Sequence, residues 1–157
     1  MIKVYKMQLD GNENIPCDIS CIPFDMKYYS EYQRIYNDCF REMRTALDIK
    51  PYDFLNDIDQ ISDKLCNINL LIINDKLIGS VACYGNEIDD LIVAPEYQHK
   101  GYGRQLLLWA VHFIRNLNSE PITLHAAEWN QKAVSLYESI GFRIVETEII
   151  NRSLIIA

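Results

Sequence analysis

The sequence predicts an α/β protein with a mixed sheet flanked by helices, and two observations predict it. Between residues 70 and 93, three β-branched or apolar runs follow one another with only turn residues between them, which is typical of strands joined by hairpins. After residue 93, strand-like runs alternate with runs of helical period, which is typical of strands joined by helices. Together the two patterns predict a mixed, mostly antiparallel sheet.

The first half of the chain is expected to contribute two strands and a long helix. Residues 3–9 alternate enough to form a strand, with Asp10 and Gly11 as turn residues, and residues 18–24 form a second, short strand. Residues 27–47 carry apolar side chains every three or four positions, which predicts an amphipathic helix that ends before Pro51. A short helix is expected over residues 57–66.

The second half is expected to alternate strands and helices. The expected strands are 70–73, 77–84, 87–93, 122–126 and 142–149, and the expected helices are 104–117 and 131–140. Asn130 is the candidate N-cap of the last helix, and Gly141 is its C-terminal glycine.

Length and composition are those of one globular domain. The 157 residues contain 49% hydrophobic and 24% charged residues, with no repeat and no linker composition, so a single domain over residues 1–157 is expected. No apolar run approaches the roughly 20 residues that span a bilayer, and the first residues do not resemble a secretory signal. A cytoplasmic location is therefore expected.

The charged residues and cysteines exclude several classes of ligand. A net charge of −7 argues against a nucleic-acid partner and is better suited to a cationic small substrate. The five cysteines are odd in number and irregularly spaced, so reduced thiols are expected rather than a disulfide framework. Cys17 and Cys21 lack a second ligand pair, so no metal site is predicted.

The segment from Glu87 to Arg104 places a strand, a glycine turn and a helix start in direct succession. Unpaired N–H groups at a helix start, together with the positive end of the helix dipole, can bind a pyrophosphate. Neither nucleotide-binding motif fits this segment. The sequence lacks the Gly-Lys-Ser/Thr of a P-loop, and Leu106 stands where a dinucleotide fingerprint needs Gly or Ala.

Two motifs in this half of the chain resemble the GNAT acyltransferase superfamily. Gln98, Gly101 and Gly103 match its pyrophosphate loop, Gln/Arg-x-x-Gly-x-Gly/Ala, after a strand that ends near Val-x-Pro. The stretch from Asn130 to Phe142 is similar to its Asn-x-x-Ala-x-x-Leu-Tyr-x-x-x-Gly-Phe element. The resemblance covers about residues 70–145, and the preceding part matches nothing specific.

The resemblance implies the GNAT fold, in which two splayed central strands hold acetyl-CoA, and it implies no metal. By the same resemblance the pantetheine arm lies near Val93 and Ala126, and the loop wraps the pyrophosphate. The implied acetyl-CoA-binding residues are Leu91, Ile92, Val93, Gln98, His99, Lys100, Gly101, Tyr102, Gly103, Arg104, Asn130 and Tyr137. A homodimer is also compatible with the family.

The expected activity is N-acetyltransfer to a small-molecule or peptidyl amine by direct attack on the thioester. The resemblance implies that the Val93 N–H stabilises the oxyanion, that Tyr137 protonates the leaving thiolate, and that Glu87 is the general base. Strand alternation would place four residues on one face: Glu87, Asp89, Leu91 and Val93. Asp89 or Asp90, acting through a water, could replace Glu87 as the base.

Other interpretations stay open at this stage. His99, His112 and His125 have no carboxylate or cysteine partner at telling spacing and are treated as loop, helix-surface and strand residues. A catalytically idle acyl-CoA-binding or sensor module would need the loop but not Tyr137. The identity of the acceptor amine is not predicted, because the residues expected to line its cleft lie in the unmatched part of the chain.

Overall fold

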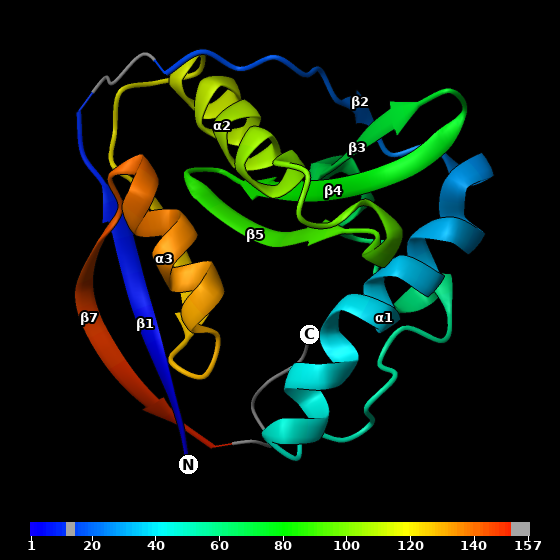
Figure 1. Cartoon of the computed structure of the whole chain (residues 1–157), viewed down its shortest axis with the longest axis horizontal. Coiled ribbons are helices and arrows are strands. Elements are labelled where there is room, and N and C mark those ends of the chain that lie inside the picture. The colour runs from blue at the N-terminus through cyan, green and yellow to red at the C-terminus, as the bar shows by residue number, and fades with distance from the viewer. Residues whose placement is uncertain (12–14, 152–157) are drawn as a thin grey trace.

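The fold is a single twisted sheet with helices on both faces (Figure 1). The computed structural model describes residues 1–11 and 15–151. The strands are β1 (Ile2–Leu9), β2 (Ile22–Pro23), β3 (Ile68–Ile73), β4 (Lys76–Tyr84), β5 (Glu87–Val93), β6 (Ile122–Ala127) and β7 (Arg143–Ile150). The helices are α1 (Tyr29–Ala46), α2 (Tyr102–Arg115) and α3 (Gln131–Ile140), with four 3-10 turns at Met26–Tyr28, Ile58–Gln60, Leu65–Asn67 and Pro95–Tyr97.

The strand order is β2-β3-β4-β5-β6-β1-β7, and only the β5–β6 pair is parallel. The expected mixed, mostly antiparallel sheet is therefore confirmed. The N-terminal strand β1 lies between β6 and β7, two strands that come more than a hundred residues later in the chain. Sequence periodicity had predicted the strand but contains no information about its neighbours.

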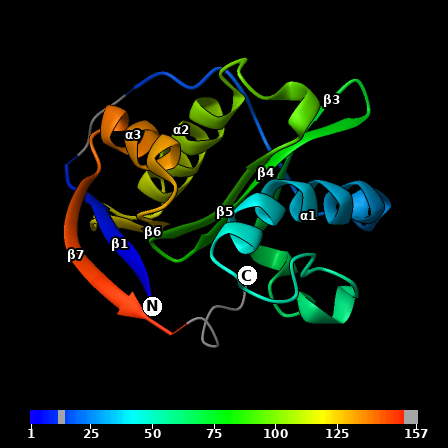
Figure 2. The ribbon, with the colours of Figure 1, turned by 60° about the horizontal axis from the view of Figure 1, so that its bottom comes forward.

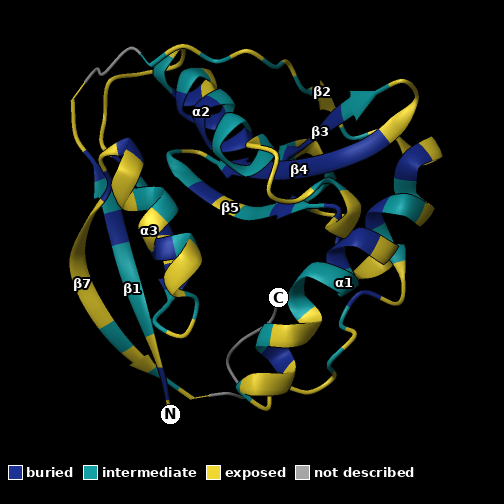
Figure 3. Cartoon of the chain, viewed as in Figure 1, coloured by how far each residue is buried: buried dark blue, intermediate teal, exposed yellow. Residues whose placement is uncertain are grey.

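Two apolar clusters cover the two faces of the sheet, because alternate residues of each strand face opposite sides. On β4, Ile78 belongs to the cluster with α2 and α3, and the adjacent Leu77 belongs to the cluster with α1. Figure 2 shows α2 and α3 on one side of the sheet and α1 on the other. Figure 3 shows the buried central strand β4 and the largely exposed edge strand β7.

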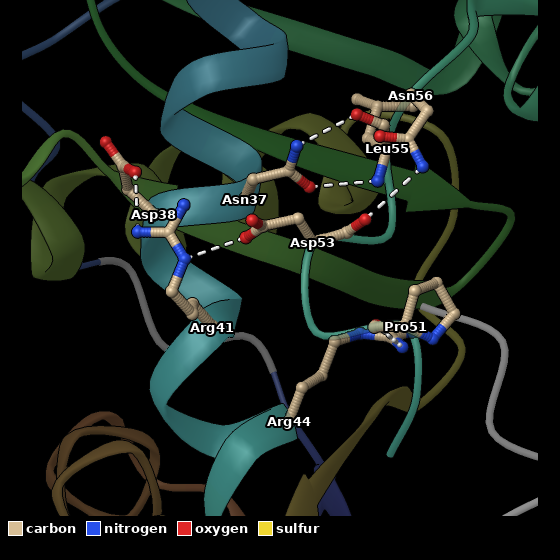
Figure 4. A network of polar contacts seen from close by, with 8 residues as sticks. All are labelled: Asn37, Asp38, Arg41, Arg44, Pro51, Asp53, Leu55 and Asn56. Carbon is tan, nitrogen blue, oxygen red and sulfur yellow. Dashed lines mark hydrogen bonds and ion pairs between the residues drawn. The ribbon is translucent and has the colours of Figure 1, made fainter.

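The loop after α1 is fastened to that helix by polar contacts (Figure 4). Asn37 exchanges two hydrogen bonds with the backbone of Leu55, at 2.8 and 2.9 Å, and Arg41 Nε donates to Asp53 at 2.7 Å. The buried Arg44 guanidinium donates to the Pro51 carbonyl at 3.0 Å and stacks on Phe54. These contacts fix the C-terminal half of α1 at the edge of the cavity described below.

Most predicted elements are present within one to two residues of their expected ends. Two predictions for the first half were wrong. The strand expected at 18–24 is reduced to Ile22–Pro23, because that segment pairs with β3 at two positions only. The helix expected at 57–66 is two separate 3-10 turns, the first closed by a capping box between Asp57 and Gln60. Among the described residues no helix has the length and apolarity needed to span a membrane.

The β3–β4 hairpin and the C-terminal end of α3 follow the predicted turn chemistry. Asn74 and Asp75 both have positive φ, 52° and 61°, as a two-residue hairpin turn matching the strand twist requires. Gly141 ends α3 at φ 118°, a conformation that strains any residue with a Cβ.

Gly79 of β4 gives a test of how tightly the sheet packs under α2. A Cβ built at this position would lie 2.6 Å from the Ile92 carbonyl oxygen and 2.8 Å from Leu106 Cδ1. We predict that Gly79→Ala lowers the free energy of unfolding by about 1–3 kcal/mol, seen as a fall in Tm of roughly 3–10 °C. Gly103→Ala is the matched control, because its new Cβ would approach no atom closer than 3.8 Å. Equal Tm values for the two variants would contradict this packing argument.

Candidate functional site

The sheet opens between β5 and β6. These parallel strands pair only at Glu87 with Thr123 and at Ile88 with Leu124, and the described chain places no further ladder pair between them. A cavity of about 1070 Å³ occupies the opening and extends to both sides of the sheet, from α3 and the start of α2 to the C-terminal half of α1 and β7. The splayed strands implied by the resemblance are thus present.

The glycine loop lies at one end of this cavity. Gly101 has φ 88° and is the N-cap of α2, which has no side-chain cap, so the first N–H groups of the helix have no capping side chain as acceptor. His99 also has a positive φ of 65°. His99, Tyr102 and Gly103 line the cavity, whereas Lys100, Gly101 and Arg104 are not among its lining residues. An uncapped helix start of this kind can accept an anion, and the anion site stays a prediction.

Val93 presents its backbone to the cavity. The Ala94 N–H donates to the Ile78 carbonyl on β4 at 2.8 Å, so by the alternation of an antiparallel ladder the N–H and C=O of Val93 face away from β4. The Val93 carbonyl accepts Cys39 Sγ–H and Gln98 Nε2–H, both at 3.0 Å. The Gln98 side chain therefore ties the loop to the end of β5, while the Val93 N–H faces the opening.

A β-bulge at Asp90 and Leu91 changes which side chains share a face. Ala82 pairs with Asp89 and Ser80 pairs with Ile92, so Val81 lies opposite two residues of β5, and Asp90 has φ 47°. The prediction that four alternate residues from Glu87 to Val93 share one face was therefore wrong. The bulge reverses the alternation, so that Leu91 and Val93 pack with the α2–α3 cluster.

The bulge directs two carboxyl groups into the cavity. The pKa of Asp90 is raised by burial and, second, by the charge of Asp89. The Asp89 side chain is open to the cavity, but protein surrounds the cavity on most sides, so desolvation also raises the pKa of this carboxyl. The Asp90 N–H donates to Asp89 at 2.8 Å and partly opposes that rise.

Tyr137 lies on α3 at the other wall of the opening. Its ring packs edge to face with Phe142 at a centroid distance of 6.3 Å, and it lines the cavity. Burial, and to a smaller extent the charge of Asp89, raises the pKa of Tyr137 to about 12. The phenol is therefore protonated at neutral pH and can act as a proton donor. Asn130 caps α3 by accepting the Ala133 N–H at 3.3 Å, and it also lines the cavity.

Glu87 is not among the cavity-lining residues, but it contacts one that is. Its carboxylate lies 2.8 Å from Nδ1 of His125, and Nε2 of the same ring is 3.9 Å from Glu148. The expectation that His125 has no carboxylate partner was wrong. The partners come from β5 and β7, 38 and 23 positions away, and no sequence spacing signals such a contact. The described residues contain no cluster of three potential metal ligands.

Further lining residues were not named as site residues from the sequence, although the region from Tyr28 to Phe54 was expected to line the acceptor cleft, and Ala133 and Leu136 are positions of the second motif. Those on α1 and the segment after it are Cys39, Phe40, Glu42, Met43, Arg44, Leu47 and Ile49, those on the outer strands are Ile2, Val4, Glu148 and Ile150, and those beside α3 are Trp129, Gln131, Lys132, Ala133 and Leu136. The predicted Leu91, Ile92, Val93 and Gln98 also line the cavity. The apolar face of α1 was predicted, but which strands it would face was not.

Comparison with known proteins places these features in one family. The model of the acetyltransferase (GNAT) family matches residues 29–142. Spermidine N(1)-acetyltransferase of Vibrio cholerae is 33% identical over 108 residues, which is 59% of this chain and 61% of that protein. The chain therefore spans less than two thirds of the length of this relative.

Solved structures agree on the fold. A GNAT-family acetyltransferase from Colwellia psychrerythraea superposes with a TM-score of 0.72 at 11% identity, covering 92% of this chain and 53% of that one. The PaiA N-acetyltransferase of Thermoplasma acidophilum, in complex with coenzyme A, gives a TM-score of 0.64 at 19% identity, with 83% and 93% covered. The family match, over well more than half of the chain, and the shared fold establish that this protein belongs to the GNAT acetyltransferase family.

Proposed function

We propose that this protein transfers an acetyl group from acetyl-CoA to the primary amine of a small cationic acceptor. The observation that carries the proposal is the cavity through the sheet, which joins an uncapped helix start on one side to a carboxylate-lined chamber on the other. An anionic cosubstrate and a cationic acceptor can thus meet at the opening from opposite sides.

The residues present fit acetyl-CoA. The free N–H groups at the start of α2 suit a pyrophosphate, and Gly103 keeps that approach open because it carries no side chain. Leu91, Val93 and Leu136 provide apolar and backbone contacts along the opening for a pantetheine arm. Membership of the family and the coenzyme A complex of the Thermoplasma protein support this cosubstrate.

The proposed reaction is direct attack of the neutral amine on the thioester carbonyl. The Val93 N–H, which faces the opening, donates to the oxygen on which negative charge develops. Collapse of the tetrahedral intermediate breaks the carbon–sulfur bond, and the Tyr137 hydroxyl gives its proton to the departing thiolate. The products are an N-acetylated amine and free CoA.

The acceptor chamber supports a cationic amine on an apolar body. Carboxyl groups line it from three elements: Glu42 on α1, Asp89 and Asp90 on β5, and Glu148 on β7. Between them lie the apolar side chains of Ile2, Val4, Met43, Leu47 and Ile150. The Vibrio relative is named for acetylation of spermidine, an aliphatic amine with this combination of charge and methylene groups.

Binding of acetyl-CoA is the first test. We predict that acetyl-CoA raises Tm in a thermal-shift series, whereas ATP and NAD at the same concentration do not, because the loop matches neither nucleotide motif. Gly103→Val should abolish the shift, since its side chain would fill the space next to the first turn of α2. A shift with NAD but none with acetyl-CoA would refute the proposed cosubstrate.

The second test removes one hydroxyl. Tyr137→Phe keeps the ring and its edge contact with Phe142, so Tm and the acetyl-CoA shift should hold. The rate of the chemical step should fall by roughly 10²-fold, as is typical of losing a general acid. Tyr52→Phe, which removes an exposed hydroxyl bonded to Asp48, is the matched control. An unchanged single-turnover rate in Tyr137→Phe would exclude the proton-donor role, and a wild type that binds acetyl-CoA without acetylating any amine would favour a binding module.

The third test uses the raised pKa of Asp90. The pKa of Asp90 is higher in the folded protein than in the unfolded chain. The free energy of unfolding of the wild type therefore falls as pH rises from the unfolded pKa to the folded pKa, and above the folded pKa the loss is complete. Asp90→Asn removes this titration, so its Tm should exceed that of the wild type at alkaline pH, and the difference should vanish below the usual range of aspartate. Above the folded pKa of about 8, where Asp90 is ionised, the KM for the amine should rise about tenfold with the loss of one charged contact.

Asp75→Asn in the exposed hairpin turn is the matched control for this test, because Asn tolerates the same positive φ. It should change neither the pH dependence of Tm nor the KM. A lower Tm for Asp90→Asn at every pH would show that the carboxyl group stabilises the fold, which contradicts the argument.

A further inference from the structure

His125 is the one imidazole on the acceptor side of the opening, among the residues that the structure describes. Its Nδ1 is hydrogen-bonded to the Glu87 carboxylate at 2.8 Å. A carboxylate can only accept, so Nδ1 carries the hydrogen, and in the neutral imidazole Nε2 is the nitrogen with the lone pair. The Nε2 atom is 3.9 Å from Glu148, beyond hydrogen-bonding distance, and the ring lines the cavity.

Strand alternation places His125 and Tyr137 on opposite faces of the sheet. Leu124 and Ala126 belong to the cluster under α2 and α3, so His125 between them points to the other face. Tyr137 packs against that α2–α3 cluster. The pairing of Lys6 with His125, and of Val4 with Glu148, sets these side chains on the same face as the acceptor chamber.

Asp89 also lines the cavity. Its charge interacts with His125 and with Tyr137, so the three groups surround the same part of the opening. An amine entering from the chamber would thus meet the imidazole on its own side, while the thiolate would depart toward the phenol on the other side.

We propose that His125 is the general base that removes the proton from the attacking amine, directly or through one water, and that Glu87 is a positioning residue that holds the imidazole. This inference rests on the proposed acetyltransfer and extends it. It also gives Glu87 a role consistent with its place outside the cavity lining.

The proton balance is complete. The acceptor ammonium gives a proton to His125 Nε2, and the neutral amine forms the new carbon–nitrogen bond as the carbon–sulfur bond breaks. The second amine proton leaves through His125 or water, and Tyr137 supplies the proton of the CoA thiol and regains one from solvent. The imidazolium formed during the step is stabilised by the Glu87 carboxylate.

The charged groups around the imidazole favour this assignment. Glu87 and Asp89 face it from β5, Glu148 faces it from β7, and Lys6 pairs with it from β1. An imidazolium that forms when the amine gives up its proton thus has three acidic groups close to it. Burial raises the pKa of Asp89 and Asp90, so a larger fraction of each carboxyl group is protonated, and unable to accept a proton, than in an exposed aspartate.

The test compares His125→Ala with wild type over a pH series, using single-turnover rates with a polyamine acceptor. We expect a rate loss of roughly 10²-fold at pH 7 that shrinks as pH approaches the pKa of the amine, because free amine needs no base. Added imidazole should restore part of the rate, which a structural defect would not allow. The acetyl-CoA thermal shift should be unchanged.

Variants of Glu87 test the positioning role. Glu87→Ala should lower the rate less than His125→Ala, and Glu87→Gln should lie nearer wild type, because its amide oxygen can still accept the Nδ1 hydrogen. Glu146→Gln is the matched control: this residue is exposed, lies opposite Lys6 in the strand register and is not among the cavity-lining residues. It should behave as wild type.

The outcomes separate the two proposals. A wild type that acetylates no amine refutes the proposed function and this role with it. An active wild type, with His125→Ala within about twofold of its rate at every pH, overturns only the role of His125. A defect that is equal at every pH and not relieved by imidazole would show a structural role and would also overturn it.

Discussion

The separation of β5 and β6 is the constraint on which the site depends. Two ladder pairs, Glu87 with Thr123 and Ile88 with Leu124, hold these parallel strands together, and beyond them the strands diverge. Backbone groups that would otherwise pair across the sheet, including the Val93 N–H, become available to a ligand. The opening also connects the two faces, so groups on opposite sides of the sheet can act on one reacting carbon.

The bulge in β5 makes the two sides of this opening chemically different. In a regular strand Asp89 and Val93 would share a face, but the extra residue turns Val93 toward the α2–α3 cluster and leaves Asp89 and Asp90 in the chamber. Two adjacent carboxyl groups in a partly desolvated cavity destabilise the fold, as their raised pKa values indicate. An ammonium group would offset this repulsion, which is a physical reason why the acidic chamber suits the proposed cationic acceptor.

Strand β1 connects the N-terminus of the chain to the site. It pairs with β6 along six positions and with β7 along seven, so it holds the two C-terminal strands in one sheet. Through these pairs Ile2 and Val4 reach the acceptor chamber, and Glu148 is placed within 3.9 Å of His125. The acceptor chamber therefore combines residues from both ends of the described chain with the C-terminal half of α1 from its middle.

Local chemistry was sufficient to predict most of the elements and the glycine loop between β5 and α2. The spacing of apolar residues predicted α1, α2 and α3, and the turn residues Asn74 and Asp75 predicted the β3–β4 hairpin. Gln98, Gly101 and Gly103 predicted the loop before α2. All of these features depend on residues that are close in sequence. The shared cavity lining of Tyr137 and Val93 agrees with the motif prediction. Only the tertiary structure decided the bulge, the position of β1, the Glu87–His125 contact and which residues of α1 line the cavity. Each of these features depends on which distant segments pair or pack. The spacing of apolar side chains within one segment does not show which other segment it will contact.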